Sequence, residues 1–206
     1  MSTDSPGGIY ASTDYGTLTI GSGPEIPFQY NPASLRRTIQ PDYAGGTGPT
    51  RSTPLMFGGA PRETIDVELQ IDAGSSSGVK PDPFPQVTEK GIRPLLAALE
   101  MAMYPPWTTV SDYQSRLQGG ALEVGVYEVP LVIFRWGARK APVRISRYTV
   151  TETLFDAQLN PVQARVSISM DVIGFSEVLP SDPAWNIYEA YQKSKESDAG
   201  TLGGGS

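Results

Sequence analysis

Two segments of this chain alternate apolar and polar residues without interruption. In residues 64–72 the apolar positions are occupied by Ile65, Val67, Leu69 and Ile71. In residues 162–172 they are occupied by Val162, Ala164, Val166, Ile168, Met170 and Val172. A period of two places successive side chains on opposite faces of a β-strand. Both segments are therefore predicted to be long strands with one apolar face and one fully polar face.

The polar face of these predicted strands needs water beside it. Bulk solvent meets this need, and so does a water-filled channel enclosed by several copies of the chain; the pattern alone leaves both possibilities open. If a channel is present, seven residues of the polar faces are candidates for lining its lumen: Asp66, Glu68, Gln70, Gln163, Arg165, Ser167 and Ser169. Same-face neighbours on a strand lie about 6.6 Å apart. The carboxylates of Asp66, Glu68 and Asp72 therefore favour a solvated or lumen-facing strand over a metal or acid–base site.

Further β segments are predicted at residues 17–20, 25–30, 131–136 and 143–153. In the last of these the apolar phase changes near Ser146 and Arg147, which predicts a β-bulge. Trp136 is assigned to the core. Residues 41–61 and 73–87 are rich in Gly, Pro or Ser and are predicted to be long loops.

Two helices are predicted. Residues 92–103 place Pro94 in a first turn and carry the apolar stripe Leu95, Leu96, Leu99 and Met103. A second, short helix begins at Pro183 with Asp182 as its N-cap and carries an aromatic stripe of Trp185, Tyr188 and Tyr191.

These elements predict a mainly β fold, a β-rich α+β domain built as an antiparallel β-barrel or sandwich with one flanking helix. The expected organisation is a flexible arm at 1–24, one β domain at 25–176, and a short helix with a flexible tail at 177–206.

The composition limits the possible chemistry. The chain of 206 residues contains no Cys and no His. Zinc, haem and iron–sulfur sites depend on these residues, as do Ser-His and Cys-His nucleophiles. The catalytic options that remain are carboxylate pairs, a perturbed Lys, a Tyr, or Mg²⁺ or Ca²⁺ held by carboxylates. Since the strand carboxylates favour a solvated face over such a site, we expect no metal, no cofactor and no enzymatic activity. The net charge of −6 argues against nucleic acid as a partner. No run approaches about 18 apolar residues, so membrane insertion is not expected, and the polar segment at residues 1–8 predicts no signal peptide.

Basic residues gather between 135 and 147. Phosphate binding is one role for them, but pairing with carboxylates of a neighbouring copy is favoured in an acidic chain. Trp107, which follows two prolines, is either part of a helix stop or an aromatic anchor at a subunit contact. The candidate inter-subunit contacts are Trp107, Arg135, Arg139, Lys140 and Arg144.

Four segments in order carry a family resemblance. They are FQYNPASL at 28–35, PRETIDVELQIDA at 61–73, GIRPLLAALE at 91–100 with YPP at 104–106, and a stretch from 130 to 170 that contains FRWG, FD and LNPVQARV. Together they resemble the N-terminal domain of contractile-injection-system tube proteins, in particular the tube initiator or spike adaptor of particles of the antifeeding-prophage type.

The resemblance implies a structural baseplate subunit with a phage-tail-tube-like fold. Such a subunit would be assembled in the cytoplasm as a component of a phage-tail-like particle. Copies would form a homohexameric ring that joins the inner tube protein to the spike or hub protein and contacts other baseplate proteins. Many family members carry a LysM module, and the roughly thirty residues after Gly174 are too few for one. Within the class, the alternative is a bulk inner-tube subunit. The alternatives outside it are an enzyme that uses carboxylates and a monomeric ligand-binding β-sandwich.

Overall fold

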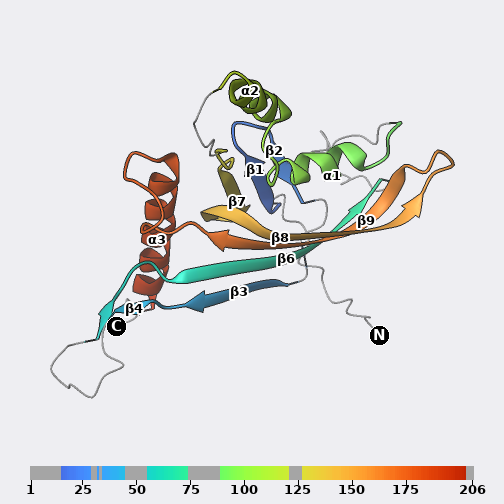
Figure 1. Ribbon diagram of the computed structural model, residues 1–206. Helices are drawn as coiled ribbons and strands as arrows, with labels where there is room; N and C mark the ends of the chain where they lie inside the picture. The colour runs from blue at the N-terminus through green and yellow to red at the C-terminus, as the bar shows by residue number, and fades with distance from the viewer. Residues whose placement is uncertain are drawn as a thin grey trace, which may run out of the picture.

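The two alternating segments are neighbouring strands of one antiparallel sheet (Figure 1). β6 (Arg62–Asp72) and β9 (Pro161–Val172) pair from Thr64 opposite Asp171 to Asp72 opposite Gln163. Apolar residues are buried on one side of both strands, as the alternation predicts. The computed structural model describes residues 15–28, 32, 34–44, 55–73, 89–120 and 127–202.

The sheet has seven strands in the order β2-β1-β7-β8-β9-β6-β3 and curls into a half-barrel. Its other members are β1 (Thr17–Ile20), β2 (Glu25–Pro27), β3 (Leu35–Gln40), β7 (Val132–Trp136) and β8 (Arg139–Phe155). β4 (Tyr43–Ala44) and β5 (Met56–Phe57) form a separate small hairpin. The fold is mainly β, with 41% of the chain in strands, which confirms the predicted class.

Three helices lie in the described part of the chain: α1 (Arg93–Glu100), α2 (Trp107–Gln118) and α3 (Pro183–Thr201). The predicted caps of α3 are confirmed, because Asp182 accepts a hydrogen bond from the backbone N–H of Ala184 at 2.8 Å. The helix is longer than expected, however, because a short helix followed by a flexible tail was predicted and the helix continues to Thr201. Lys193 pairs with Glu189 one turn earlier and Lys195 reaches the sheet, so the helix keeps partners beyond its aromatic stripe.

One hydrophobic core fills the curl of the sheet. Phe134, Leu18, Ile65, Ile168 and Met170 are among its fully buried side chains. α1 adds Leu96 and Leu99 to this core, and α3 adds Tyr188 and Tyr191. Burial of each such side chain contributes about 1.5–3 kcal/mol, so these contacts dominate the stability of the fold. The predicted bulge in β8 is confirmed, because its register with β9 shifts between Ile145 and Arg147.

Two of the motif segments meet at the start of α1. The backbone N–H of Ile92 donates to the carbonyl of Pro161 at 2.9 Å. Gly91 has φ +60°, and a Cβ at this position would lie 2.1 Å from that same oxygen. Asp156 shapes the turn before Pro161 by accepting hydrogen bonds from the backbone and the side chain of Asn160, and these bonds hold its pKa below the ordinary value. The Gly-Ile and Asn-Pro motifs are therefore two sides of one contact.

Candidate interaction surfaces

All seven residues predicted to line a lumen lie on one face of the sheet, which we call the polar face. Its side chains are linked across strands: Ser169 donates to Asp66 at 2.6 Å, and Gln163 donates to Asp72 at 3.1 Å. Arg165 forms an ion pair with Glu68 at 3.1 Å. The seven residues, grouped by strand, are Asp66, Glu68 and Gln70 on β6 and Gln163, Arg165, Ser167 and Ser169 on β9.

The bonds on the polar face add little to the stability of the fold. The side chains of Arg165 and Glu68 are 67% and 62% exposed, and exposed ion pairs contribute about 0–1 kcal/mol. The polar character of this face is compatible with exposure to bulk solvent and with exposure to a water-filled channel. The described side chains of β6 and β9 on this face provide a hydrated surface with acidic and basic groups next to each other.

The polar face continues onto β7 and β8 with basic side chains. Register places Arg135 opposite Lys140, and Arg144 opposite Asp171, on this face. Arg144 pairs with Glu177 at 2.9 Å, and Arg135 lies 3.6 Å from Glu25. The carboxylates that these two arginines contact therefore belong to the same chain.

Arg139 does not belong to this basic group. It lies opposite Trp136, whose ring packs with Phe28 and Phe134 on the core side of the sheet. Alternation along β8 therefore separates Arg139 from its neighbour Lys140, and the predicted single cluster of basic residues is wrong in this respect. Sequence proximity suggested one cluster, but β pairing divides it between two faces.

Trp107, the remaining predicted contact, is the first residue of α2 and its side chain is 79% exposed. Met101 and Tyr104, in the turn that leads to it, are also exposed. We call these three residues the α1–α2 corner. Each of these side chains is large and exposed, and side chains of this kind are often buried in contacts with partners.

A second exposed apolar group is the β4–β5 hairpin. Tyr43 and Phe57 stack with ring centroids 5.6 Å apart, and the Phe57 side chain is 76% exposed. Leu55 and Met56 beside them are exposed as well. The sequence predicted only a loop at 41–61, so this aromatic pair is a feature that the Gly and Pro content concealed.

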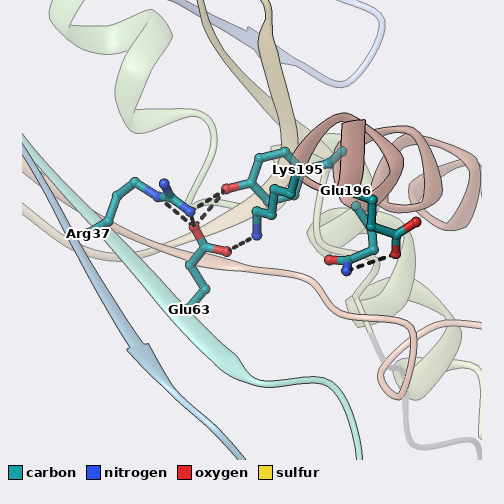
Figure 2. A network of polar contacts seen from close by, with 6 residues as sticks. Arg37, Glu63, Lys195 and Glu196 are labelled. Carbon is teal, nitrogen blue, oxygen red and sulfur yellow. Dashed lines mark hydrogen bonds and ion pairs between the residues drawn. The ribbon is translucent and has the colours of Figure 1, made fainter. Parts of the chain in front are cut away.

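A buried ionic cluster fixes α3 to the sheet (Figure 2). Glu63 is 3% exposed and lies on the apolar face of β6, in phase with Ile65. Its carboxylate accepts hydrogen bonds from Tyr191 and Lys195 of α3 at 2.7 Å each, and from Nε of Arg37 of β3 at 2.8 Å. Burial by itself would raise the pKa of Glu63, but these three donors outweigh it and hold the pKa below the ordinary value. Burial is the largest cause of a raised pKa at Tyr191, and the hydrogen bond to Glu63 raises it further.

Sequence reasoning did not identify this cluster, although a signal existed. Residue 63 continues the apolar phase of the strand, so a carboxylate there predicts a buried charge that needs partners. The partners come from residues 37, 191 and 195, which no local pattern connects with residue 63. The cluster has one acid and three donors, an arrangement that stabilises a carboxylate and does not supply a poised acid–base pair.

A cavity of about 320 Å³ lies where β3, β6 and β8 approach the segment after β9. Its lining includes Asp42, Arg62, Arg144, Asp171 and Glu177. Arg144 lies 2.9 Å from Glu177 and 3.9 Å from Asp171, so the two nearest acids are paired with a cation. Among the residues described, no group of three or more metal-ligating side chains occurs.

None of the helices in the described part of the chain is both long and apolar enough to cross a lipid bilayer. No family model and no curated protein matches the sequence.

Proposed function

We propose that this protein is a structural subunit of a contractile injection machine, in which copies form a six-fold ring that joins the inner tube to the spike. The polar face would line a water-filled channel. The observation that carries the proposal is this continuous polar face, which runs across β6 and β9 and onto β8 while the opposite face buries the core.

The resemblance of four ordered sequence segments supports the same function. Two of those segments meet at the contact between Gly91 and Pro161, so they are elements of one structural unit. Gly91 is required there by its positive φ and by the close approach of a carbonyl. The Gly-Ile and Asn-Pro motifs therefore specify a contact within the fold. Shared motifs of this kind support a shared fold.

The edges of the sheet also favour assembly. Within the described residues the sheet ends at β2 on one side and β3 on the other. Unpaired strand edges are sites where another chain can add hydrogen bonds. A ring in which the edge of one copy meets the next would pair both edges through a repeated heterologous contact.

Size-selective labelling tests the proposal. The chain has no Cys, so Ser167→Cys on the polar face gives a single thiol. In the assembled particle we expect this thiol to react with a small maleimide but not with a maleimide coupled to a globular protein, which cannot enter a narrow channel.

The unassembled Ser167→Cys protein is the matched control, and it should react with both reagents. Equal reactivity with the large reagent before and after assembly would place the polar face on the outside and would contradict a role in lining the channel.

A further inference from the structure

α3 is attached to the rest of the chain through one narrow stripe of its surface. Of its 19 residues, three are buried: Ala184, Tyr188 and Tyr191. Lys195 continues their spacing of three or four residues, so all four side chains lie along one side of the helix. A helix held by so few side chains can separate from the sheet as a unit of its own.

The core of the sheet depends little on α3. Its fully buried side chains Leu18, Phe134 and Ile168 belong to strands, and α1 adds Leu96 and Leu99. Figure 1 shows α3 at the end of the sheet where β6 begins, away from α1. α3 therefore covers one end of the half-barrel, and the strands share a core with α1 that does not pass through this cover.

An ionic contact holds the C-terminal half of the stripe. Figure 2 shows the carboxylate of Glu63 between Arg37 of β3 and Lys195 of α3. Nζ of Lys195 lies 2.7 Å from Oε2 of Glu63, and Nη2 of Arg37 lies 2.7 Å from Oε1. Lys195 also lies over the ring of Tyr191, 3.9 Å from its centroid. Because the Glu63 side chain is only 3% exposed, its charge is stable there only while these partners stay in place.

Glu63 is the member of this cluster that responds to acid. Tyr, Lys and Arg side chains titrate near or above about pH 10, so protonation in acid changes the charge of the carboxylate and leaves its partners as they are. Titratable groups approach it from three elements. They are Arg37 of β3, Tyr188, Tyr191 and Lys195 of α3, and Arg139 at the start of β8, whose charge reaches Tyr191.

We propose that α3 is an acid-released strap: protonation of Glu63 frees the helix from the sheet while the strands and α1 remain folded. Protonation leaves Arg37 and Lys195 beside a neutral carboxyl group. Their side chains are 26% and 32% exposed, so both cations already reach water and gain full hydration when the helix leaves. The strap does not depend on the proposed assembly of copies.

The direction of the response follows from proton linkage. Burial raises the pKa of Glu63, but its donors outweigh burial and hold the pKa below the ordinary value of 4.5 in the docked form. The undocked form, in which the carboxylate meets water, therefore takes up the proton first as the pH falls. Below 4.5 the ratio of undocked to docked protein should rise by up to tenfold per pH unit, until the pKa of the docked form is reached.

Hydrogen exchange followed by mass spectrometry tests the strap, because it measures the opening of α3 and of the sheet separately in one sample of the wild-type protein. Most of the stability of a helix comes from its packing, so the amides of α3 lose protection when it undocks. After correction for the intrinsic rate at each pH, these amides should exchange up to tenfold faster per pH unit below 4.5. The amides of β6 and β9 should keep their protection over the same range.

Two lysines of α3 provide a matched pair of variants. Lys195→Met removes the cation that α3 gives to Glu63, whereas Lys193→Met removes the cation of an exposed pair with Glu189. At neutral pH, Lys195→Met should speed the exchange of α3 by roughly tenfold or more, as expected when a buried carboxylate loses a partner. Lys193→Met should change it by less than about twofold. Neither variant should change the exchange of β6 and β9.

Equal acceleration of α3 and the strands in acid would show that the helix opens only with the whole fold, and would overturn the strap. Protection of α3 that stays constant from neutral pH to about pH 3 would overturn it as well. The same holds for equal effects of Lys193→Met and Lys195→Met, and for α3 amides that are unprotected already at neutral pH. All of these measurements use the unassembled protein, so their failure leaves the proposed ring standing.

Discussion

The hydroxyl group of Tyr191 donates a hydrogen bond of 2.7 Å to Oε1 of Glu63, joining residues 128 positions apart in the sequence. This bond connects α3 to the apolar face of β6 at the only buried carboxylate in the described part of the chain. Because a buried charge is costly when it loses a partner, the position of α3 depends on a few polar contacts as well as on packing.

Removing the Tyr191 hydroxyl should destabilise the fold, whereas removing the Tyr148 hydroxyl should not. Tyr191→Phe leaves Glu63 with one donor fewer and is expected to lower the free energy of unfolding by about 1–3 kcal/mol. The buried hydroxyl of Tyr148 has no hydrogen-bond partner among the residues that the structure describes, so Tyr148→Phe should be neutral or stabilising. Urea unfolding of the two variants measures this difference, and equal losses would show that the bond to Glu63 contributes nothing specific.

Glu63 should make the stability of the protein sensitive to acid. Its pKa is lowered in the folded state, so its contribution is present above the ordinary value of 4.5 and is lost as the pH falls through the folded-state pKa. Glu63→Gln should cost about 3 kcal/mol near neutral pH. The difference in free energy of unfolding between the wild-type protein and Glu63→Gln should then narrow as the pH falls below 4.5. Unfolding curves at several pH values test this, and a gap that stays constant down to pH values near 2 would contradict it.

Gly91 should tolerate no side chain, because it combines a positive φ with a close backbone contact. Gly137 has the positive φ alone, so comparing the two positions separates the two effects. Both have a φ near +60°, but a Cβ at 137 meets no atom within 4 Å, whereas a Cβ at 91 meets the Pro161 carbonyl. Gly137→Ala is therefore expected to cost only the backbone term of about 1–2 kcal/mol. Gly91→Ala should cost more and should displace α1. Thermal unfolding of both variants decides the point, and equal melting temperatures would refute the packing argument.

Neutralising the acidic groups of the polar face should spare the fold. Asp66→Asn with Glu68→Gln removes the charge of the half-buried Asp66 and of the exposed Glu68, and the amide of residue 66 keeps an oxygen that can accept from Ser169. The double variant should change the free energy of unfolding by no more than about 1 kcal/mol. If the face lines a channel that carries cargo, the same double variant should assemble normally but load cargo less well. Normal loading by assembled double-variant particles would count against this role of the acidic groups.

The strands at 64–72 and 162–172 could be predicted from the sequence, because each buries one face and exposes the other. This arrangement leaves an alternating pattern that can be read without knowing the neighbouring strands. β3 could not be predicted, because Arg37 stands at a position of the strand that faces the core. Its charge is paired there with Glu63, 26 residues away in the sequence. α2 also lacked a signal, because its side chains contribute nothing to the core. The grouping of Arg135, Lys140 and Arg144 without Arg139 depends on strand register, which residue spacing does not reveal.

Electron microscopy of the protein produced together with the products of its neighbouring genes tests the central claim most directly. We expect a hollow cylinder whose wall contains the seven-stranded sheet, with the strands β6 and β9 turned toward the channel. Particles that never include this chain, or a chain that remains monomeric in the presence of those proteins, would contradict it.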